Sequence, residues 1–203
     1  MFFILYKHLQ NFRNMKIPIF FLFIIPLFFA SCKKDPTKNA KLPPITQEGK
    51  NTVGFTLNNE VWVPYYKCRF MGNPCGEISA RYGESGGAAP YSIDFQFIRQ
   101  RKDKLSALTI SSSGSGAVTT IGNKIDSISI DFQDENSTGN TGIYRGPIAS
   151  GNNKFIITKI DFQNQIISGE FIFDLIEQNG SGKIITIKDG RFDFKLNACK
   201  CSN

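Results

Sequence analysis

The chain has 203 residues, a formal net charge of +7 and a single histidine, His8, which precedes an apolar N-terminal run. If that run is a cleaved signal, the mature chain has no histidine, which excludes Ser-His-Asp and Cys-His catalysis and histidine-ligated metals. Cleavage before Cys32 also leaves 21 Lys+Arg against 17 Asp+Glu, a charge of +4 without a polybasic cluster, so nucleic acid is not an expected partner. The glycine motifs of nucleotide-binding loops are missing, and we therefore expect no nucleotide, no cofactor and no metal.

The N-terminus has the pattern of a secretory signal. Residues 17–30 are apolar or proline throughout, and cations but no acidic residue precede them. This run is shorter than the ~20 residues that a membrane-spanning helix needs. Ala30 and Ser31 are small enough for a signal peptidase, and Cys32 follows them directly, an order that resembles the lipobox of bacterial lipoproteins. The resemblance implies that residues 1–31 are removed and that Cys32 carries acyl chains such as palmitate; the alternative is a cysteine that merely follows a cut made elsewhere.

Residues 32–52 are expected to form the lipidated anchor and a flexible tether. The segment after Cys32 is polar, rich in proline and without a hydrophobic period. Lys33 stands where an aspartate retains many lipoproteins in the inner membrane, so we expect the outer membrane, with the domain facing the periplasm or the cell surface. The signal is complete whether the chain starts at Met1 or at Met15.

Residues 53–203 are expected to form a single all-β domain. Apolar and polar residues alternate along them, which is typical of antiparallel strands with one wet face. The clearest runs are YSIDFQFI (91–98), DSISIDF (126–132), GEFIFDL (169–175) and GRFDFKL (190–196). Asn58-Asn59 and Asp189-Gly190 are among the turn signals between such runs. The pattern predicts an antiparallel β-sandwich or a partly open β-barrel of roughly ten strands.

The tetrapeptide IDFQ occurs three times, at 93–96, 130–133 and 160–163. Its aspartates would have to form one row to bind Ca²⁺ or a sugar, but calcium takes about six to eight oxygens at close range, and these acids are scattered. The simpler interpretation, which we favour, places Ile and Phe inward and Asp and Gln toward water.

The cysteines after Cys32 are even in number, which in an exported chain predicts two disulfides. Cys199 and Cys201 lie two residues apart, so on a strand their side chains point the same way and cannot easily bridge each other. The expected pairing joins them to Cys68 and Cys75 in either order, with a Cys68–Cys75 bridge as an alternative. A zinc site is disfavoured, because C-x₆-C and C-x-C lack the usual knuckle spacing.

An aromatic cluster in VWVPYYK is the best candidate for ligand binding. Trp62, Tyr65 and Tyr66 surround a proline, and aromatic faces presented together suit a sugar ring or an apolar peptide. The alternative is that Trp62 is buried in the core of the first hairpin, with the tyrosines at its rim.

Catalysis has little support in the sequence, and no residue is assigned a catalytic role. A glycosidase-like hydrolase needs two carboxylates in a cleft, and Asp131, Asp134 and Glu135 are the best candidates. Because a chain with 17 acids always offers such pairs, we expect a non-catalytic binding or structural module instead. Its expected partners are the membrane, through the anchor, and a glycan or an envelope protein.

Two further likenesses concern the mature chain. The segments LPPITQEGKNTVGFTLNNEVWVP (42–64), ISGEFIFDL and ITIKDGRFDFKL resemble a family of small Bacteroidota lipoproteins with an all-β domain of unknown function. This resemblance implies a lipid-anchored β domain and carries over no catalytic residue. DSI, at 126–128, resembles the short O-glycosylation motif of that phylum, with Ser127 as the acceptor.

Overall fold

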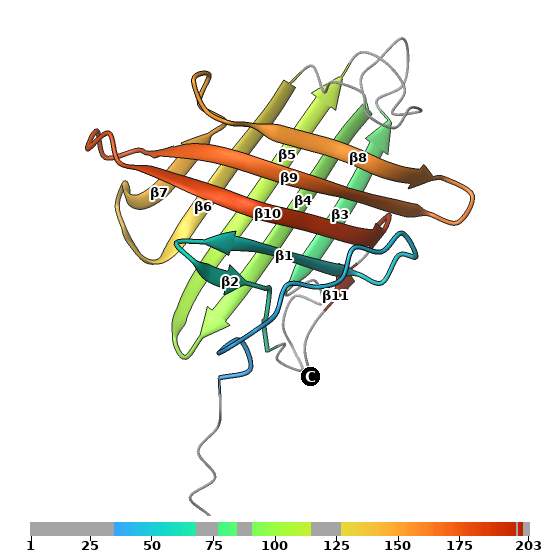
Figure 1. The fold of residues 1–203 in the computed structure, drawn as a ribbon, viewed down its shortest axis with the longest axis horizontal. Helices are drawn as coiled ribbons and strands as arrows, with labels where there is room; N and C mark the ends of the chain where they lie inside the picture. Colours follow the sequence, from blue (N-terminus) through green and yellow to red (C-terminus); the bar gives the residue numbers. More distant parts are fainter. Residues whose placement is uncertain (1–34, 68–76, 85–90, 115–126, 198, 201–203) are drawn as a thin grey trace, which may run out of the picture. The chain divides into compact units, whose positions relative to one another are not determined.

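A computed structural model of the chain describes residues 35–67, 77–84, 91–114, 127–197 and 199–200 (Figure 1). The strands are β1 (Thr52–Leu57), β2 (Glu60–Trp62), β3 (Ile78–Glu84), β4 (Tyr91–Arg101), β5 (Lys104–Gly114), β6 (Ser127–Thr138), β7 (Thr141–Gly146), β8 (Lys154–Asp161), β9 (Ile166–Glu177), β10 (Ile184–Lys195) and β11 (Cys199–Lys200). None of the described residues belongs to a helix long and apolar enough to cross a membrane. The predicted all-β fold is confirmed.

The strands join in one antiparallel sheet whose order is β11-β3-β4-β5-β6-β7-β9-β10-β1-β2. β9 is the corner strand, since residues 166–172 pair with β8 and residues 176–177 pair with β7. Because the strand order of the described residues does not return from β2 to β11, the sheet is not closed. This topology agrees with the predicted sandwich or partly open barrel.

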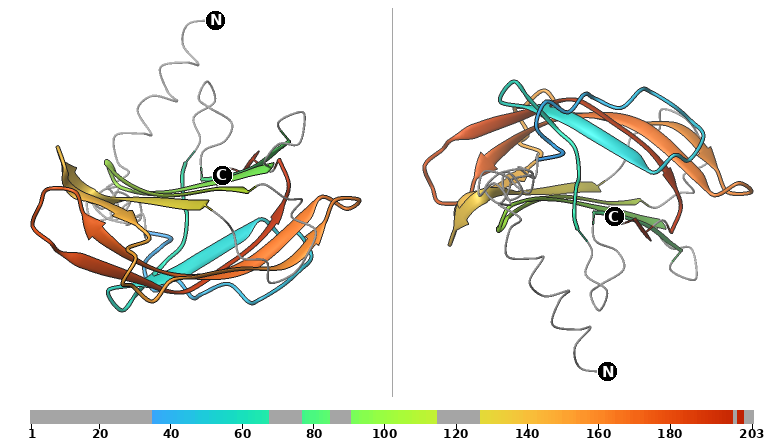
Figure 2. Two further views of the ribbon diagram at one scale, coloured as in Figure 1. Left: turned by 90° about the horizontal axis from the view of Figure 1, so that it is seen from above. Right: turned by 90° about the horizontal axis from the view of Figure 1, so that it is seen from below.

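The sheet folds over into two layers that cross one another (Figures 1 and 2). One layer holds β3, β4, β5 and β6, and the other holds β8, β9, β10, β1 and β2. After β2 the chain passes from the second layer to the first. There the Tyr65 amide donates to the Ile98 carbonyl at 3.0 Å, and the Gln100 amide donates to the Tyr65 carbonyl at 2.6 Å. The two layers are thereby tied together at the end of β4.

Aromatic rings fill the space between the layers. Phe95 of β4 contacts Phe192 and Phe194 of β10 at centroid distances of 4.9 and 5.3 Å. Phe55 of β1 packs edge-on against Phe132 of β6 at 6.4 Å. All five rings are almost fully buried. Within the described residues the interior is therefore a packed core, which hydrophobic burial stabilises by about 25 cal/mol for each Å² removed from water.

β10 continues through the position where the sequence predicts a turn. Asp189 and Gly190 form a bulge, and the register of β10 against β9 shifts between Ile187 and Gly190. Asp189 adopts a left-handed backbone, with a φ of 52°. The extra residue switches the buried series from Ile187 to Gly190 and Phe192, that is, from odd to even positions. The Asp-Gly pair therefore bends the strand without reversing it.

The last part of the predicted tether is built into the domain. Residues 46–50 surround the carboxylate of Asp193 on β10, which is only 1 % exposed. The Thr46 hydroxyl donates to this carboxylate at 2.6 Å, and the three successive amides of 48–50 donate at 2.8 to 3.2 Å. The Ser168 hydroxyl of β9 adds a bond of 2.8 Å. These residues were predicted to be flexible, but their polar groups are donors to a buried charge, so they belong to the domain.

Candidate binding site at the arginine pair

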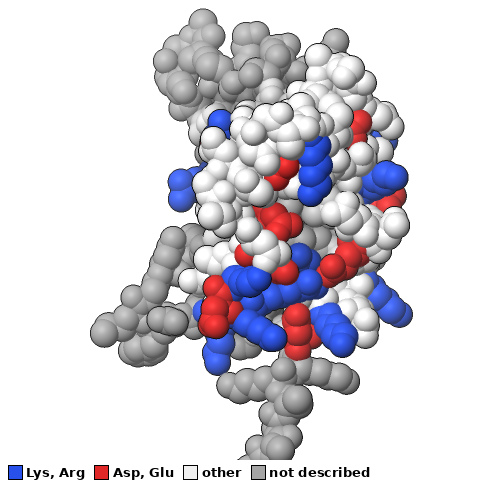
Figure 3. Space-filling view, turned by 90° about the vertical axis from the view of Figure 1, so that its left-hand side faces the viewer, with Lys and Arg blue, Asp and Glu red and all other residues white. Residues whose placement is uncertain are grey.

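Charged side chains gather toward the end of the domain where β4 turns into β5 (Figures 1 and 3). The inward series of β4 is Ile93, Phe95 and Phe97, and the two-residue period of a strand extends it to Arg99 and Arg101. Arg99 is 7 % exposed, and Arg101 is half-buried. An apolar stripe that ends in two arginines places both guanidinium groups at the edge of the core.

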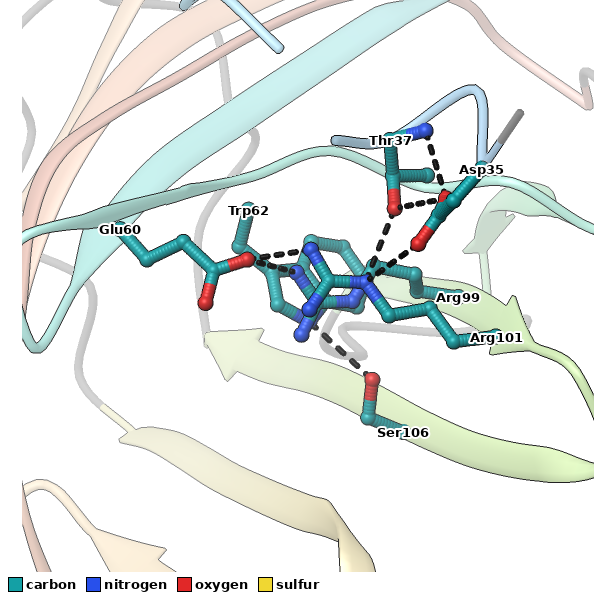
Figure 4. Close-up of polar contacts among 7 residues, drawn as sticks. All are labelled: Asp35, Thr37, Glu60, Trp62, Arg99, Arg101 and Ser106. Carbon is teal, nitrogen blue, oxygen red and sulfur yellow. Dashed lines mark hydrogen bonds and ion pairs between the residues drawn. The ribbon is translucent and has the colours of Figure 1, made fainter. Parts of the chain in front are cut away.

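Arg99 is held by packing and by charge. Its guanidinium carbon lies 5.2 Å from the centroid of the Trp62 ring, a cation–π contact, and its Nη1 lies 3.7 Å from Glu60 Oε1 (Figure 4). Burial, followed by the neighbouring charge of Arg101, lowers the pKa of Arg99. In the described part of the chain, Arg99 Nε has no hydrogen-bond partner.

Arg101 connects β2 to the first described residues (Figure 4). Its Nη2 contacts the Glu60 carboxylate, and its Nε donates to the Thr37 hydroxyl at 2.9 Å and lies 3.4 Å from Asp35 Oδ2. Thr37 donates from its amide and its hydroxyl to Asp35 Oδ1, at 2.8 and 2.7 Å. Burial by itself would raise the pKa of Asp35, but the bonds from Thr37 and the charge of Arg101 hold it below its ordinary value. Asp35 is therefore an ionised acceptor near neutral pH.

The surface beside these side chains forms an open pocket of about 520 Å³. Its lining residues are Asp35, Thr37, Lys38, Asn39, Ala40, Asn59, Glu60, Val61 and Arg101. Sites for small molecules commonly measure about 300–1,000 Å³. The carboxylates of this wall accept hydrogen bonds, the cations donate them, and the Asn amides do both. A ligand with many hydroxyl groups would find partners for both functions of each hydroxyl.

Trp62 is a core residue, and its ring does not face a ligand. It is 1 % exposed, stacks on Phe55 at a centroid distance of 4.7 Å, and donates from Nε1 to Ser106 Oγ at 3.2 Å. Its indole is therefore not available to a sugar ring, which corrects its prediction as a binding residue and agrees with the alternative. Tyr65 and Tyr66 are half-buried, and Tyr65 is fixed to β4 through its backbone.

The carboxylates considered for hydrolysis lie on β6. Asp131 accepts a hydrogen bond from Arg145 Nε at 2.7 Å in an exposed ion pair. Asp134 accepts from the Asn136 amide at 2.9 Å, and Glu135 is half-buried on the same strand. None of the three lines the pocket beside the arginine pair.

Other predicted residues cannot be placed as sites. Four of them lie outside the described residues: Cys32, Cys68, Cys75 and Cys201. Cys199 is described only through its backbone in β11, which pairs with Ser79 of β3. Ser127 is the first residue of β6. Lipidation, disulfide pairing and glycosylation therefore stay predictions.

The arginine pair was not foreseen, although the sequence holds a signal for it. In FQFIRQR, at 95–101, the alternation continues without a break through Arg99 and Arg101, so both arginines keep the inward direction of the phenylalanines. Two cations with inward parity need acceptors, because buried charges are paired in folded proteins. Such acceptors are a reason to expect a polar cluster at this end of β4.

Comparison with known proteins finds no relative: no protein-family model, no curated protein and no solved structure matches the chain. The resemblance to a Bacteroidota lipoprotein family stays a prediction. The function has to be inferred from the sequence pattern and from the geometry of the described residues.

Proposed function

We propose that the chain is a lipid-anchored, non-catalytic module of the cell envelope that binds a glycan in the pocket beside Arg101. The observation that carries this proposal is the pocket wall, where carboxylates, cations and amides surround about 520 Å³. Every sugar hydroxyl both donates and accepts, so a wall that mixes fixed donors with fixed acceptors suits a glycan better than a wall of one charge. The anchor is Cys32, and the expected location is the outer membrane.

The polar groups of the wall are positioned without a ligand. One carboxylate oxygen of Glu60 contacts both arginines, and Asp35 is held by Arg101 and Thr37. The turn between β1 and β2 adds Asn59, whose backbone is fixed in the left-handed region at a φ of 64°. Preorganised groups cost less conformational entropy when a ligand binds. This geometry supports recognition by several weak polar contacts made together.

The same carboxylates are poorly suited to acid catalysis. A glycosidase needs a general acid whose pKa is raised by its surroundings. The pKa of Asp35 is lowered instead, and Glu60 faces two arginines. Hydrolysis through Asp131 and its neighbours on β6 is the alternative function.

Asn59→Gly tests the binding site without disturbing the turn. Glycine adopts the left-handed backbone freely, so this change removes one amide from the pocket wall and keeps the hairpin. Asn58→Gly is the matched control, since Asn58 lies in the same turn at a φ of 51°, is exposed and does not line the pocket. On an array of envelope glycans, Asn59→Gly should weaken binding by about tenfold, the effect of one lost hydrogen bond. Asn58→Gly should bind as the wild type does.

Equal binding by both variants, or the absence of glycan binding by the wild type, would contradict the proposal. Release of free sugar from the array that disappears in Asp131→Asn would establish the hydrolase instead. The anchor has its own check, because the intact mass of protein extracted from membranes should include acyl chains. Cys32→Ser should move the protein out of the membrane fraction.

A further inference from the structure

The turn between β9 and β10 holds the sequence QNGSGK (178–183), which contains the one Asn-Gly pair of the chain. This turn lies beside β7, where the Gln178 amide donates to the Ile143 carbonyl at 2.9 Å (Figure 1). We propose that Asn179 is a site of spontaneous deamidation in the folded protein, and that the acid it forms loosens the contact between this turn and the start of β7. The reaction needs only water, and the inference does not rest on the proposed function.

The backbone of this turn is open to attack on the Asn179 side chain. Asn179, Gly180, Ser181 and Gly182 are all exposed. Gly180 has a left-handed backbone, with a φ of 79°, and among the described residues a Cβ atom placed on it would meet nothing within 4 Å. In the described part of the chain the Gly180 amide donates no hydrogen bond. Because glycine has no side chain to shield it, this nitrogen is an accessible nucleophile.

The Asn179 side chain is folded back over the following residues. Its Oδ1 accepts a hydrogen bond from the Ser181 amide at 2.8 Å, which closes an Asx turn around the Gly180 nitrogen. Attack of this nitrogen on Asn179 Cγ places negative charge on Oδ1, toward which the Ser181 N–H already points. A donor that is aimed in advance at developing charge lowers the barrier of such a step.

The atoms of the reaction balance with water as the only other reactant. The bond between the Gly180 nitrogen and Asn179 Cγ forms, and this nitrogen gives up its proton. The bond between Cγ and Nδ2 breaks, and Nδ2 leaves as ammonia with that proton, so that a succinimide ring remains. Water then opens one of the two C–N bonds of the ring and yields either aspartate or isoaspartate. The final products are a carboxylate and an ammonium ion.

The new carboxylate would lie beside a buried one. Glu177 is 7 % exposed, and its carboxylate accepts hydrogen bonds from the Gly142 amide of β7 at 2.7 Å and from the Ser181 hydroxyl at 2.8 Å. Hydrogen bonds from Gly142, from Ser181 and, to a smaller extent, from the Asn179 side chain lower the pKa of Glu177, so it is ionised near neutral pH. Deamidation replaces the Asn179 donor with a second negative charge, and isoaspartate also lengthens the backbone of the turn. Both changes disturb the acceptor that holds Gly142.

Incubation of the full-length protein in heavy-oxygen water tests the modification. The folded protein and a synthetic peptide of residues 174–184 are kept at the same mildly alkaline pH, and both are then analysed by mass spectrometry. Asn179 should convert in the folded protein at least as fast as in the peptide, with heavy oxygen in the product. Asn164 is the matched control, because it is exposed in the β8–β9 turn and precedes Gln165, which is also left-handed, at a φ of 58°, but has a side chain. Slower conversion of Asn179 in the folded protein than in the peptide, or equal conversion of Asn164, would overturn the proposal.

Two variants separate the reaction from its consequence. Asn179→Ser keeps an oxygen that can accept from the Ser181 amide but has no Cγ to attack, so it should form no succinimide. Asn179→Asp carries the charge of the product from the start. Hydrogen exchange at neutral pH should be severalfold faster at the Gly142 amide in Asn179→Asp than in Asn179→Ser, with amides of the β1–β2 turn as the internal reference. Equal exchange of Gly142 in the two variants would overturn the loosening of β7.

Discussion

Asp193 shows how one buried charge fixes a segment that has few apolar residues. Its carboxylate accepts hydrogen bonds from the hydroxyls of Thr46 and Ser168 and from the backbone amides of residues 48–50. Burial by itself would raise the pKa of Asp193, but these hydrogen bonds hold it below its ordinary value. The group is therefore ionised in the folded protein, and its five donors are satisfied together.

Asp193→Asn should lower the free energy of unfolding by about 3 kcal/mol at pH 7. The substitution removes the negative charge, and the NH₂ group of asparagine would point its two N–H donors at hydroxyl and amide donors that now bind the carboxylate. The folded-state pKa of Asp193 lies below its unfolded value of about 3.9, so the stabilisation is complete above that value and is lost as the pH falls through the folded-state pKa. Denaturant titrations at several pH values should show the difference between the wild type and the variant shrinking below about pH 4.

Asp189→Asn is the control for this experiment, since Asp189 lies on the same strand, is exposed, and has a left-handed backbone that asparagine tolerates. Its free energy of unfolding should stay close to that of the wild type across the pH range. A constant difference between Asp193→Asn and the wild type from pH 7 to pH 3 would contradict the ionised state assigned to Asp193.

At the scale of strands, β9 and β10 are joined by two glycine–phenylalanine pairs. Gly169 lies opposite Phe192, and Gly190 lies opposite Phe171. A Cβ atom on Gly169 would come within 2.6 Å of the Phe192 ring, and one on Gly190 would overlap the Phe171 ring. Each ring thus covers the glycine of the neighbouring strand, and close approach, not backbone freedom, explains the glycine.

Gly169→Ala should destabilise the domain by about 1–3 kcal/mol, because the added methyl group overpacks the core against the Phe192 ring and the Ile156 carbonyl. Thermal unfolding measures the effect. Gly83→Ala is the matched control in β3, where, among the described residues, the added Cβ would meet the Ser92 hydroxyl, at 3.1 Å. Equal melting temperatures for the two variants would show that the glycine–phenylalanine contact is dispensable.

The alternation of residues predicted most strands because a strand has a period of two and one face of this sheet is buried. The three IDFQ copies show where the two-residue period fails to predict burial. Phe95 and Phe132 are buried as expected, but Phe162 is 43 % exposed and contacts Tyr82 at a centroid distance of 5.2 Å. β8 has a bulge after Ile157 and ends before Phe162, so the third copy loses the inward parity. Bulges and strand ends are set by neighbouring strands, which a local pattern does not contain.

The candidate site was harder to predict than the strands because its contacts join distant parts of the chain. Arg101 and Glu60 are 41 residues apart, and the bond between Glu48 and Asp193 spans 145 residues. Composition predicted correctly that residues around Glu48 are polar, but whether a polar segment is solvated or bound depends on the acceptor that the fold brings to it. Sequence alone gave no partner for that segment.

At the scale of the whole molecule, the packed interior and the fixed position of residues 35–40 determine where a ligand can bind. The rings between the layers leave recognition to the surface, and residues 35–40 form part of that surface in the pocket beside Arg101. Arg101 holds this segment through Asp35 and Thr37. The position of this segment on the domain therefore depends on one half-buried arginine.

Arg101→Gln should release the segment while the rest of the domain stays folded. The loss of the ion pair to Asp35 and of the bond to Thr37 should lower the free energy of local opening by about 1.4 kcal/mol, which corresponds to about tenfold faster trypsin cleavage after Lys38. Arg145→Gln is the control, since it removes an equivalent pair with Asp131 on the outer face of the sheet. Cleavage after Lys38 at the wild-type rate in Arg101→Gln would mean that the segment is held by contacts other than those of Arg101.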